Sequence, residues 1–65
     1  MEVKEKAQII RKIDLEMQDA NNKQWEAIVS GVYANAKGGD NGWLGIAEEA
    51  PEVIEAFYPI AITFK

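Results

Sequence analysis

The sequence predicts a mainly helical protein, because one apolar stripe at helical spacing runs through more than half of the chain. Between Val3 and Ala36, apolar residues recur every three or four positions and fall on one side of a single helical wheel. Residues common in helices dominate the first half of this stretch. A glycine-rich run after Lys37 and two prolines divide the remainder into short segments. The predicted architecture is one small domain, residues 1–65, with a long N-terminal helix, a short second helix and an extended C-terminal segment.

The run Asp19-Ala20-Asn21-Asn22 is the weak point of the long helix. Asparagine and aspartate side chains bond to nearby backbone and so compete with helix formation. Asn21, followed three residues later by Gln24, also matches an N-terminal capping pair. The apolar stripe nevertheless keeps one phase on both sides of the asparagines, which favours a single helix, bent or broken near residues 20–22. A continuous helix would extend about 50 Å, so we expect a second subunit to cover it.

An alternative α+β fold follows from the alternation of polar and apolar residues between Lys12 and Gln18. Asn21-Asn22 would then form the turn of a hairpin over about residues 12–33. The alternation accounts for Leu15, which the helical wheel leaves off the apolar face. Lysine, aspartate and glutamate are poor strand formers, however, so helix is the preferred interpretation.

The two prolines define the C-terminal elements. Pro51 suits the first turn of a helix and Pro59 would stop one, so the second helix is expected over about residues 51–58. Residues 60–64 alternate large apolar side chains with period two, which predicts an extended segment. Its backbone would need a partner strand, either from the hairpin or from a second subunit.

Composition limits the classes of function. The 65 residues include no cysteine and no histidine, which excludes disulfides, Cys/His metal sites and thiol nucleophiles. Asp40-Asn41-Gly42 does not begin a calcium loop, because the twelfth residue is Pro51 and not glutamate. We therefore predict no catalytic residue, no metal and no cofactor. With no signal peptide and no apolar stretch long enough to span a bilayer, a cytoplasmic protein is expected.

Charge is distributed unevenly along the chain. The net charge is −4, and from Gln24 onward six acidic residues face only Lys37 and Lys65. A region without a basic patch cannot neutralise phosphates, so direct nucleic-acid binding is not expected. An acidic surface suits a basic protein partner, and an acidic mimic of nucleic acid is a further alternative.

The first functional hypothesis is a non-catalytic interaction protein that acts as a homo-oligomeric inhibitor or adaptor of another protein. A chain this short buries only about 60% of the surface that its unfolded form exposes, which favours self-association through the stripe. Trp43 follows a polar loop, and an aromatic anchor beside polar groups is typical of binding surfaces. The expected subunit interface comprises Ile10, Ile13, Met17, Ile28 and Val32. The expected partner- or ligand-binding residues are Trp43, Asp40, Asn41 and Tyr58.

The alternative hypothesis is a protein that binds or sequesters a small molecule, such as a nucleotide-like ligand or a metabolite. Trp43 and Tyr58 would clamp a flat ring beside Asn41, in a pocket at the subunit interface. Because the second half of the chain has few basic residues, an anionic ligand would also need lysine or arginine from a neighbouring chain.

Overall fold

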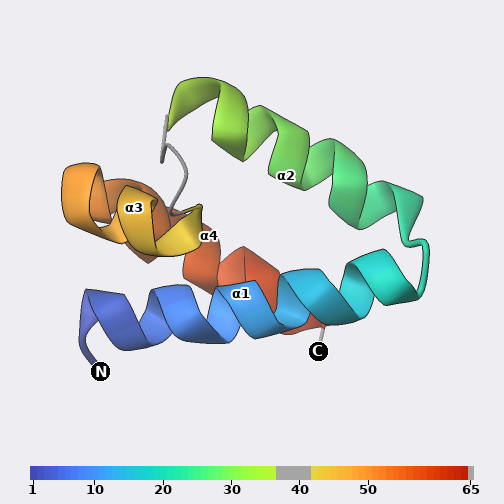
Figure 1. The fold of residues 1–65 in the computed structure, drawn as a ribbon, viewed down its shortest axis with the longest axis horizontal. Coiled ribbons are helices and arrows are strands. Elements are labelled where there is room, and N and C mark those ends of the chain that lie inside the picture. Colours follow the sequence, from blue (N-terminus) through green and yellow to red (C-terminus); the bar gives the residue numbers. More distant parts are fainter. Residues whose placement is uncertain (37–41, 65) are drawn as a thin grey trace.

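The computed structural model describes residues 1–36 and 42–64, and this part of the chain is built from helices without any strand (Figure 1). The elements in chain order are α1 (Val3–Asp19), α2 (Lys23–Asn35), α3 (Trp43–Glu49), α4 (Pro51–Ala61) and the 3₁₀ turn η2 (Ile62–Phe64). The prediction of a mainly helical protein is confirmed. The alternative of a hairpin over residues 12–33 is wrong, because both halves of that range are helical.

The long N-terminal helix is interrupted at residues 20–22, where a bend or a break was expected, and the chain reverses direction there, so the favoured continuous helix is not formed. Asn21 adopts a left-handed backbone conformation with φ of 54°. The N–H groups of Asn21 and Asn22 donate to the carbonyls of Gln18 and Met17, at 3.1 and 3.0 Å, which is the Schellman pattern at a helix C-terminus. The side chain of Asn22 then accepts a 3.0 Å hydrogen bond from the N–H of Trp25 and caps α2. The two asparagines thus end one helix and begin the next.

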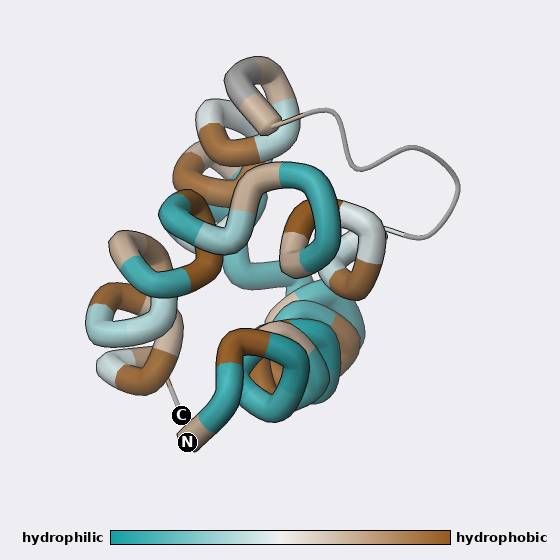
Figure 2. The backbone as a smooth tube through the Cα atoms, turned by 90° about the vertical axis from the view of Figure 1, so that its left-hand side faces the viewer, coloured by the Kyte–Doolittle hydropathy of each residue, from teal (hydrophilic) through white to brown (hydrophobic). Residues whose placement is uncertain are grey.

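The reversal lays α1 and α2 antiparallel along the longest axis, and α3 and α4 also pack against α1, with α4 passing behind it (Figure 1). The molecule measures 28 × 24 × 18 Å, so α1 alone, about 25 Å long, spans its length. Within each helix, hydrophilic and hydrophobic residues alternate around the turns (Figure 2). The α1 part of the apolar stripe is therefore folded against the rest of its own chain.

The core lies where α1, α3 and α4 meet, and α2 reaches it mainly through one side chain. Among the described side chains of α2, only Trp25 is buried. Its indole ring lies 5.5 Å from that of Phe57 and 5.2 Å from that of Phe64. The buried apolar residues are Ala7, Ile10, Ile13, Trp25, Ala36, Trp43, Ile46, Ile54, Phe57 and Ala61.

The C-terminal segment is helical, and the prediction of an extended 60–64 is wrong. Helix α4 begins at Pro51 as expected but continues through Pro59 to Ala61, followed by η2. Pro59 is exposed, and so is Glu55, whose carbonyl loses its intrahelical donor to the proline. The helix continues because it brings Ala61 and Phe64 onto the same face as Phe57.

Two backbone features set the position of α3. Gly42, directly before the helix, has φ of 58° and ψ of −126°, a combination that favours glycine. At the other end Ala50 has φ of −140° and ψ of 64°, outside the helical region that a following proline disfavours, and Pro51 starts α4 immediately. These two backbone conformations set where α3 begins and how the chain turns from α3 into α4.

Candidate functional site

The most unusual residue in the structure is Asp14, a carboxylate in the interior. Its side chain is only 8% exposed. One carboxylate oxygen accepts a 2.8 Å hydrogen bond from Nε1 of Trp25, and the other accepts a 3.1 Å bond from Nε1 of Trp43. Indole nitrogen can only donate, so both oxygens act as acceptors. A buried carboxylate is tolerated only when such donors replace its water shell.

This hydrogen-bonded triad joins three helices. Asp14 lies on α1, Trp25 on α2 and Trp43 on α3. The ring of Trp43 also stacks on Phe57 of α4, with centroids 5.5 Å apart and an interplanar angle of 3°. Every buried side-chain nitrogen and oxygen among the described residues has a hydrogen-bond partner. The hydrogen bonds of the buried carboxylate are therefore satisfied within the protein, and aromatic rings surround it, as expected of a group that stabilises the fold.

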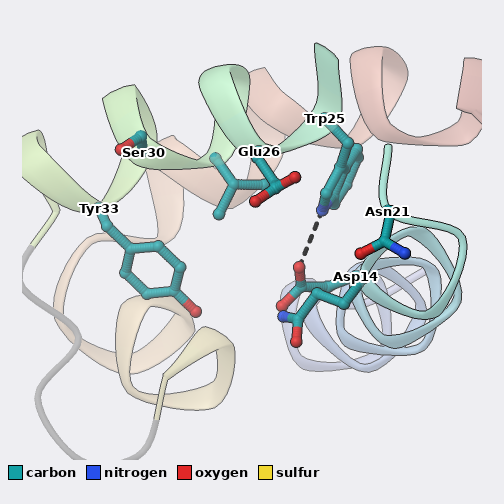
Figure 3. A pocket seen from close by; sticks show the side chains of 8 residues that line it. Asp14, Asn21, Trp25, Glu26, Ser30 and Tyr33 are labelled. Atoms are coloured by element: carbon teal, nitrogen blue, oxygen red, sulfur yellow. Dashed lines mark hydrogen bonds between the residues drawn. The ribbon is translucent and has the colours of Figure 1, made fainter. Parts of the chain in front are cut away.

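Tyr33 extends this centre toward the surface. Its ring lies 5.0 Å from that of Trp43, and its hydroxyl points toward Asp14 (Figure 3). Burial raises the pKa of the Tyr33 hydroxyl above its ordinary value of 10.0, and the negative charge of Asp14 raises it further. The phenol is therefore neutral near pH 7 and is able to donate a hydrogen bond.

One hollow, of about 590 Å³, lies between α1 and α2 above the triad (Figure 3). Its inner wall is Asp14 with Trp25, and Tyr33 closes one end. Glu26 stands at the rim, where its carboxylate pairs with Lys23 at 3.4 Å. Hydrogen-bonding groups thus dominate this hollow. The complete lining is Asp14, Gln18, Asn21, Trp25, Glu26, Val29, Ser30 and Tyr33.

A second hollow, which we call the α2–α4 groove, lies on the opposite side of α2. It measures about 520 Å³, and its floor includes Phe57, whose ring contacts Trp25 below. The walls are apolar except for one charged residue, Glu52. Ile60, at one end, is 47% exposed although it is a large hydrophobic residue. The complete lining is Ile28, Gly31, Val32, Glu52, Val53, Ala56, Phe57 and Ile60.

The charges around the α2–α4 groove are predominantly negative. Among the described residues of α3 and α4 there are four glutamates and no lysine or arginine. Glu55 pairs with Lys6 of α1 at 2.8 Å, and that lysine also lies 5.5 Å from the centre of the Tyr58 ring. Glu52, which lines the groove, makes no ion pair within the described residues. The groove therefore combines an apolar lining with one carboxylate, Glu52.

The predicted partner- or ligand-binding residues do not assemble into one site. Trp43 is 2% exposed and packs in the core, so it is not available as a surface anchor. Tyr58 lies against Lys6, whereas its neighbour Phe57 is the residue that stacks on Trp43. The clamp expected between Trp43 and Tyr58 is therefore not formed. Asp40 and Asn41 lie outside the described residues.

The five predicted interface residues divide into two groups. Ile10 and Ile13 are buried in the core of their own chain, and Met17 is half-buried against it. Ile10 and Ile13 cannot form a surface for a second subunit in this structure, because the chain's own helices already cover them. Ile28 and Val32, in contrast, line the α2–α4 groove.

Sequence reasoning missed Asp14 as a site residue, although a signal for it was present. Asp14 lies seven residues after Ala7 and four after Ile10, which places it inside the apolar stripe. A single carboxylate in such a stripe needs donors from elsewhere in the chain, and tryptophan offers an apolar body with one N–H group. Which of the two tryptophans would supply it cannot be found without the fold.

Within residues 1–36 and 42–64, no three side chains of the metal-binding types gather closely enough to hold an ion, and no helix is both long and apolar enough to cross a membrane. Comparison of the chain with protein-family models, with curated proteins and with solved structures finds no match.

Proposed function

We propose that this chain is a non-catalytic interaction protein that acts as an inhibitor or adaptor, and that its contact surface is the α2–α4 groove. The observation that carries this proposal is the groove itself, an apolar channel left open between two helices of a very small protein. Ile28, Val32 and Val53 are only half-buried there, and Ile60 is largely exposed. Apolar surface gathered in a concave site is typical of binding sites, unlike single exposed residues.

The homo-oligomer stays a prediction. The α1 part of the apolar stripe packs against α3 and α4, and its α2 part is only half-buried. Of the expected interface, only Ile28 and Val32 face a hollow, and both belong to the groove. A partner bound in the groove would contact these two side chains together with Val53 and Ile60.

The proposal is tested by filling the groove without unfolding the protein. Gly31 lines the groove, and a Cβ added there would meet nothing within 4 Å. Gly31→Gln places a long side chain in the channel, and Ser30→Gln places the same side chain on the hollow beside α1 as a matched control. We expect immobilised wild type and Ser30→Gln to retain the same purified partner, and Gly31→Gln to lose it. Equal retention by all three proteins would refute an interaction through the groove.

A second candidate function is small-molecule binding in the hollow between α1 and α2. The specific observation is its lining, which offers the acceptors Asp14 and Glu26 with the Tyr33 hydroxyl and includes no lysine or arginine. Such a lining suits a small organic cation and not a nucleotide-like anion. Titration with primary amines and guanidinium compounds, followed by tryptophan fluorescence, tests this function. A saturable change that Glu26→Gln weakens supports it, and a flat response rejects it.

A further inference from the structure

The α2–α4 groove has the shape of a binding site for one more helix. Its walls come from two helices, with contacts at i, i+3 and i+4 on α2 and at i, i+3, i+4 and i+7 on α4. Ridges at these spacings flank grooves into which side chains of another helix fit. From Val53 to Ile60 the longer wall extends about 10 Å, which is about two turns of helix. An occupant would therefore present apolar side chains over two to three turns.

The charge around the groove defines the polar side of that occupant. Glu52 lies in the lining, and Glu48 and Glu49 precede it at the end of α3, with no ion pair to any of the three among the described residues. Pairing with lysine or arginine on an incoming helix would satisfy Glu52 in the lining, and the other glutamates of α3 and α4 add to the negative charge of this part of the chain, so acidic flanks would be repelled.

A second copy of this chain does not offer that combination. A two-fold contact through the groove would bring Glu52 of both copies into one interface, without a basic residue in the lining to pair with either. Of the exposed basic residues, Lys23 at the start of α2 pairs with Glu26, and Lys4, Arg11 and Lys12 lie on α1. The outer face of α1 carries only one exposed large hydrophobic residue, Leu15. An apolar stripe flanked by positive charge is thus absent from the described outer surface of α1.

Building on the interaction function proposed above, we infer that the α2–α4 groove binds a basic amphipathic helix of another protein. The apolar stripe of that helix lies against Val32, Val53 and Ile60, and its lysine or arginine side chains reach Glu52 at the rim.

The test uses the full chain and three fluorescein-labelled peptides of about 18 residues, long enough to form helix. One has leucine at i, i+3, i+4 and i+7 with lysine elsewhere, the second has glutamate in place of lysine, and the third is a scrambled version of the first. Fluorescence anisotropy measures binding at low and high salt. We expect the leucine–lysine peptide to bind about tenfold or more tightly than the other two, since both the apolar stripe and the charge contribute.

Variants of the chain locate the contact. Gly31→Gln, and Ala56→Gln from the facing helix, should each weaken binding about tenfold, and Ser30→Gln should leave it unchanged. Glu52→Gln should weaken binding about two- to fivefold and reduce its salt dependence, while Glu26→Gln on the other side of α2 does neither. Circular dichroism establishes that each variant is folded.

Each result distinguishes this inference from the interaction function on which it rests. If the glutamate peptide or the scrambled peptide binds as tightly as the leucine–lysine peptide, the inference that the groove binds a basic amphipathic helix is refuted. If the peptides do not discriminate in this way but a protein partner is still captured by wild type and lost by Gly31→Gln, the interaction function is supported and only the basic helix is rejected. Sedimentation that shows dimers of wild type and monomers of Gly31→Gln overturns the inference in favour of a second copy.

Discussion

Replacing Asp14 with asparagine tests whether the buried carboxylate holds α1, α2 and α3 together. The amide has one oxygen to accept from an indole, and its NH₂ group would face the N–H of the other tryptophan. One indole N–H and one amide donor then lack acceptors, and each unsatisfied buried group costs about 1–3 kcal/mol. We therefore expect Asp14→Asn to lower the free energy of unfolding by about 2–4 kcal/mol.

That loss is large for a protein of this size. A chain of 65 residues has a free energy of unfolding of about 3–10 kcal/mol, so the substitution would remove a substantial share of it. The corresponding fall in Tm is on the order of 10–25 °C. At the low end of this stability range the variant would be partly unfolded at room temperature.

Urea unfolding, followed by far-ultraviolet circular dichroism and by tryptophan fluorescence, measures the effect. The matched control is Glu16→Gln, which removes the same charge from an exposed position on α1. It should change the free energy of unfolding by less than about 0.5 kcal/mol. In a double-mutant cycle with Trp43→Phe, a coupling energy of about 1–3 kcal/mol is expected. If Asp14→Asn is as stable as Glu16→Gln, the carboxylate is not a structural centre and the argument from its hydrogen bonds fails.

Three further predictions follow from local features. Because the pKa of Tyr33 is raised in the folded state, the unfolded chain loses the phenolic proton first, so the free energy of unfolding is insensitive to this group below about pH 10 and falls as pH rises through the folded-state pKa. Tyr33→Phe should remove that part of the decrease in stability at alkaline pH. In Asp14→Asn, tyrosinate absorbance should show that Tyr33 titrates at a lower pH. Asn22→Ala should lose the cap on α2 and destabilise the protein by about 1 kcal/mol, with Asn22→Asp retaining most of the stability in the same thermal scan. In urea titrations, Gly42→Ala should destabilise the protein by about 1–3 kcal/mol, because Gly42 has a positive φ. Gly31→Ala, inside α2 where a Cβ meets nothing within 4 Å, should instead stabilise the protein by about 0.5–1 kcal/mol. Equal effects of the two substitutions would contradict this explanation.

The two hollows in which we propose binding lie beside α2, which has one buried side chain among its described residues. Trp25 connects α2 to the Asp14 centre on one side and to Phe57, beneath the α2–α4 groove, on the other. A ligand in either hollow would contact a residue that packs directly against this ring. Tryptophan fluorescence therefore reports on both sites and serves as a second readout for the peptide titrations.

The C-terminal segment shows how one residue type can mislead a prediction. Proline ends many helices, so Pro59 and the alternating residues after it indicated an extended segment. The same sequence also contains apolar residues at helical spacing, Ile54, Phe57, Ala61 and Phe64, and all four face the core. Burial of that face outweighs the missing hydrogen bond at an exposed proline, and the helix continues.

The sequence by itself determined the helical class, the start of α4 at Pro51 and the apolar stripe of α1, because helix propensity and periodicity depend on residues close together in the chain. Only the tertiary structure decided where that stripe would be covered. The break at Asn21-Asn22 preserves the phase of the stripe, so one continuous helix and a folded-back pair of helices have the same pattern. The choice between them depends on contacts between distant residues, above all the two indole N–H groups that meet at Asp14. The same distant contacts buried Trp43 and left Ile28 and Val32 facing the groove.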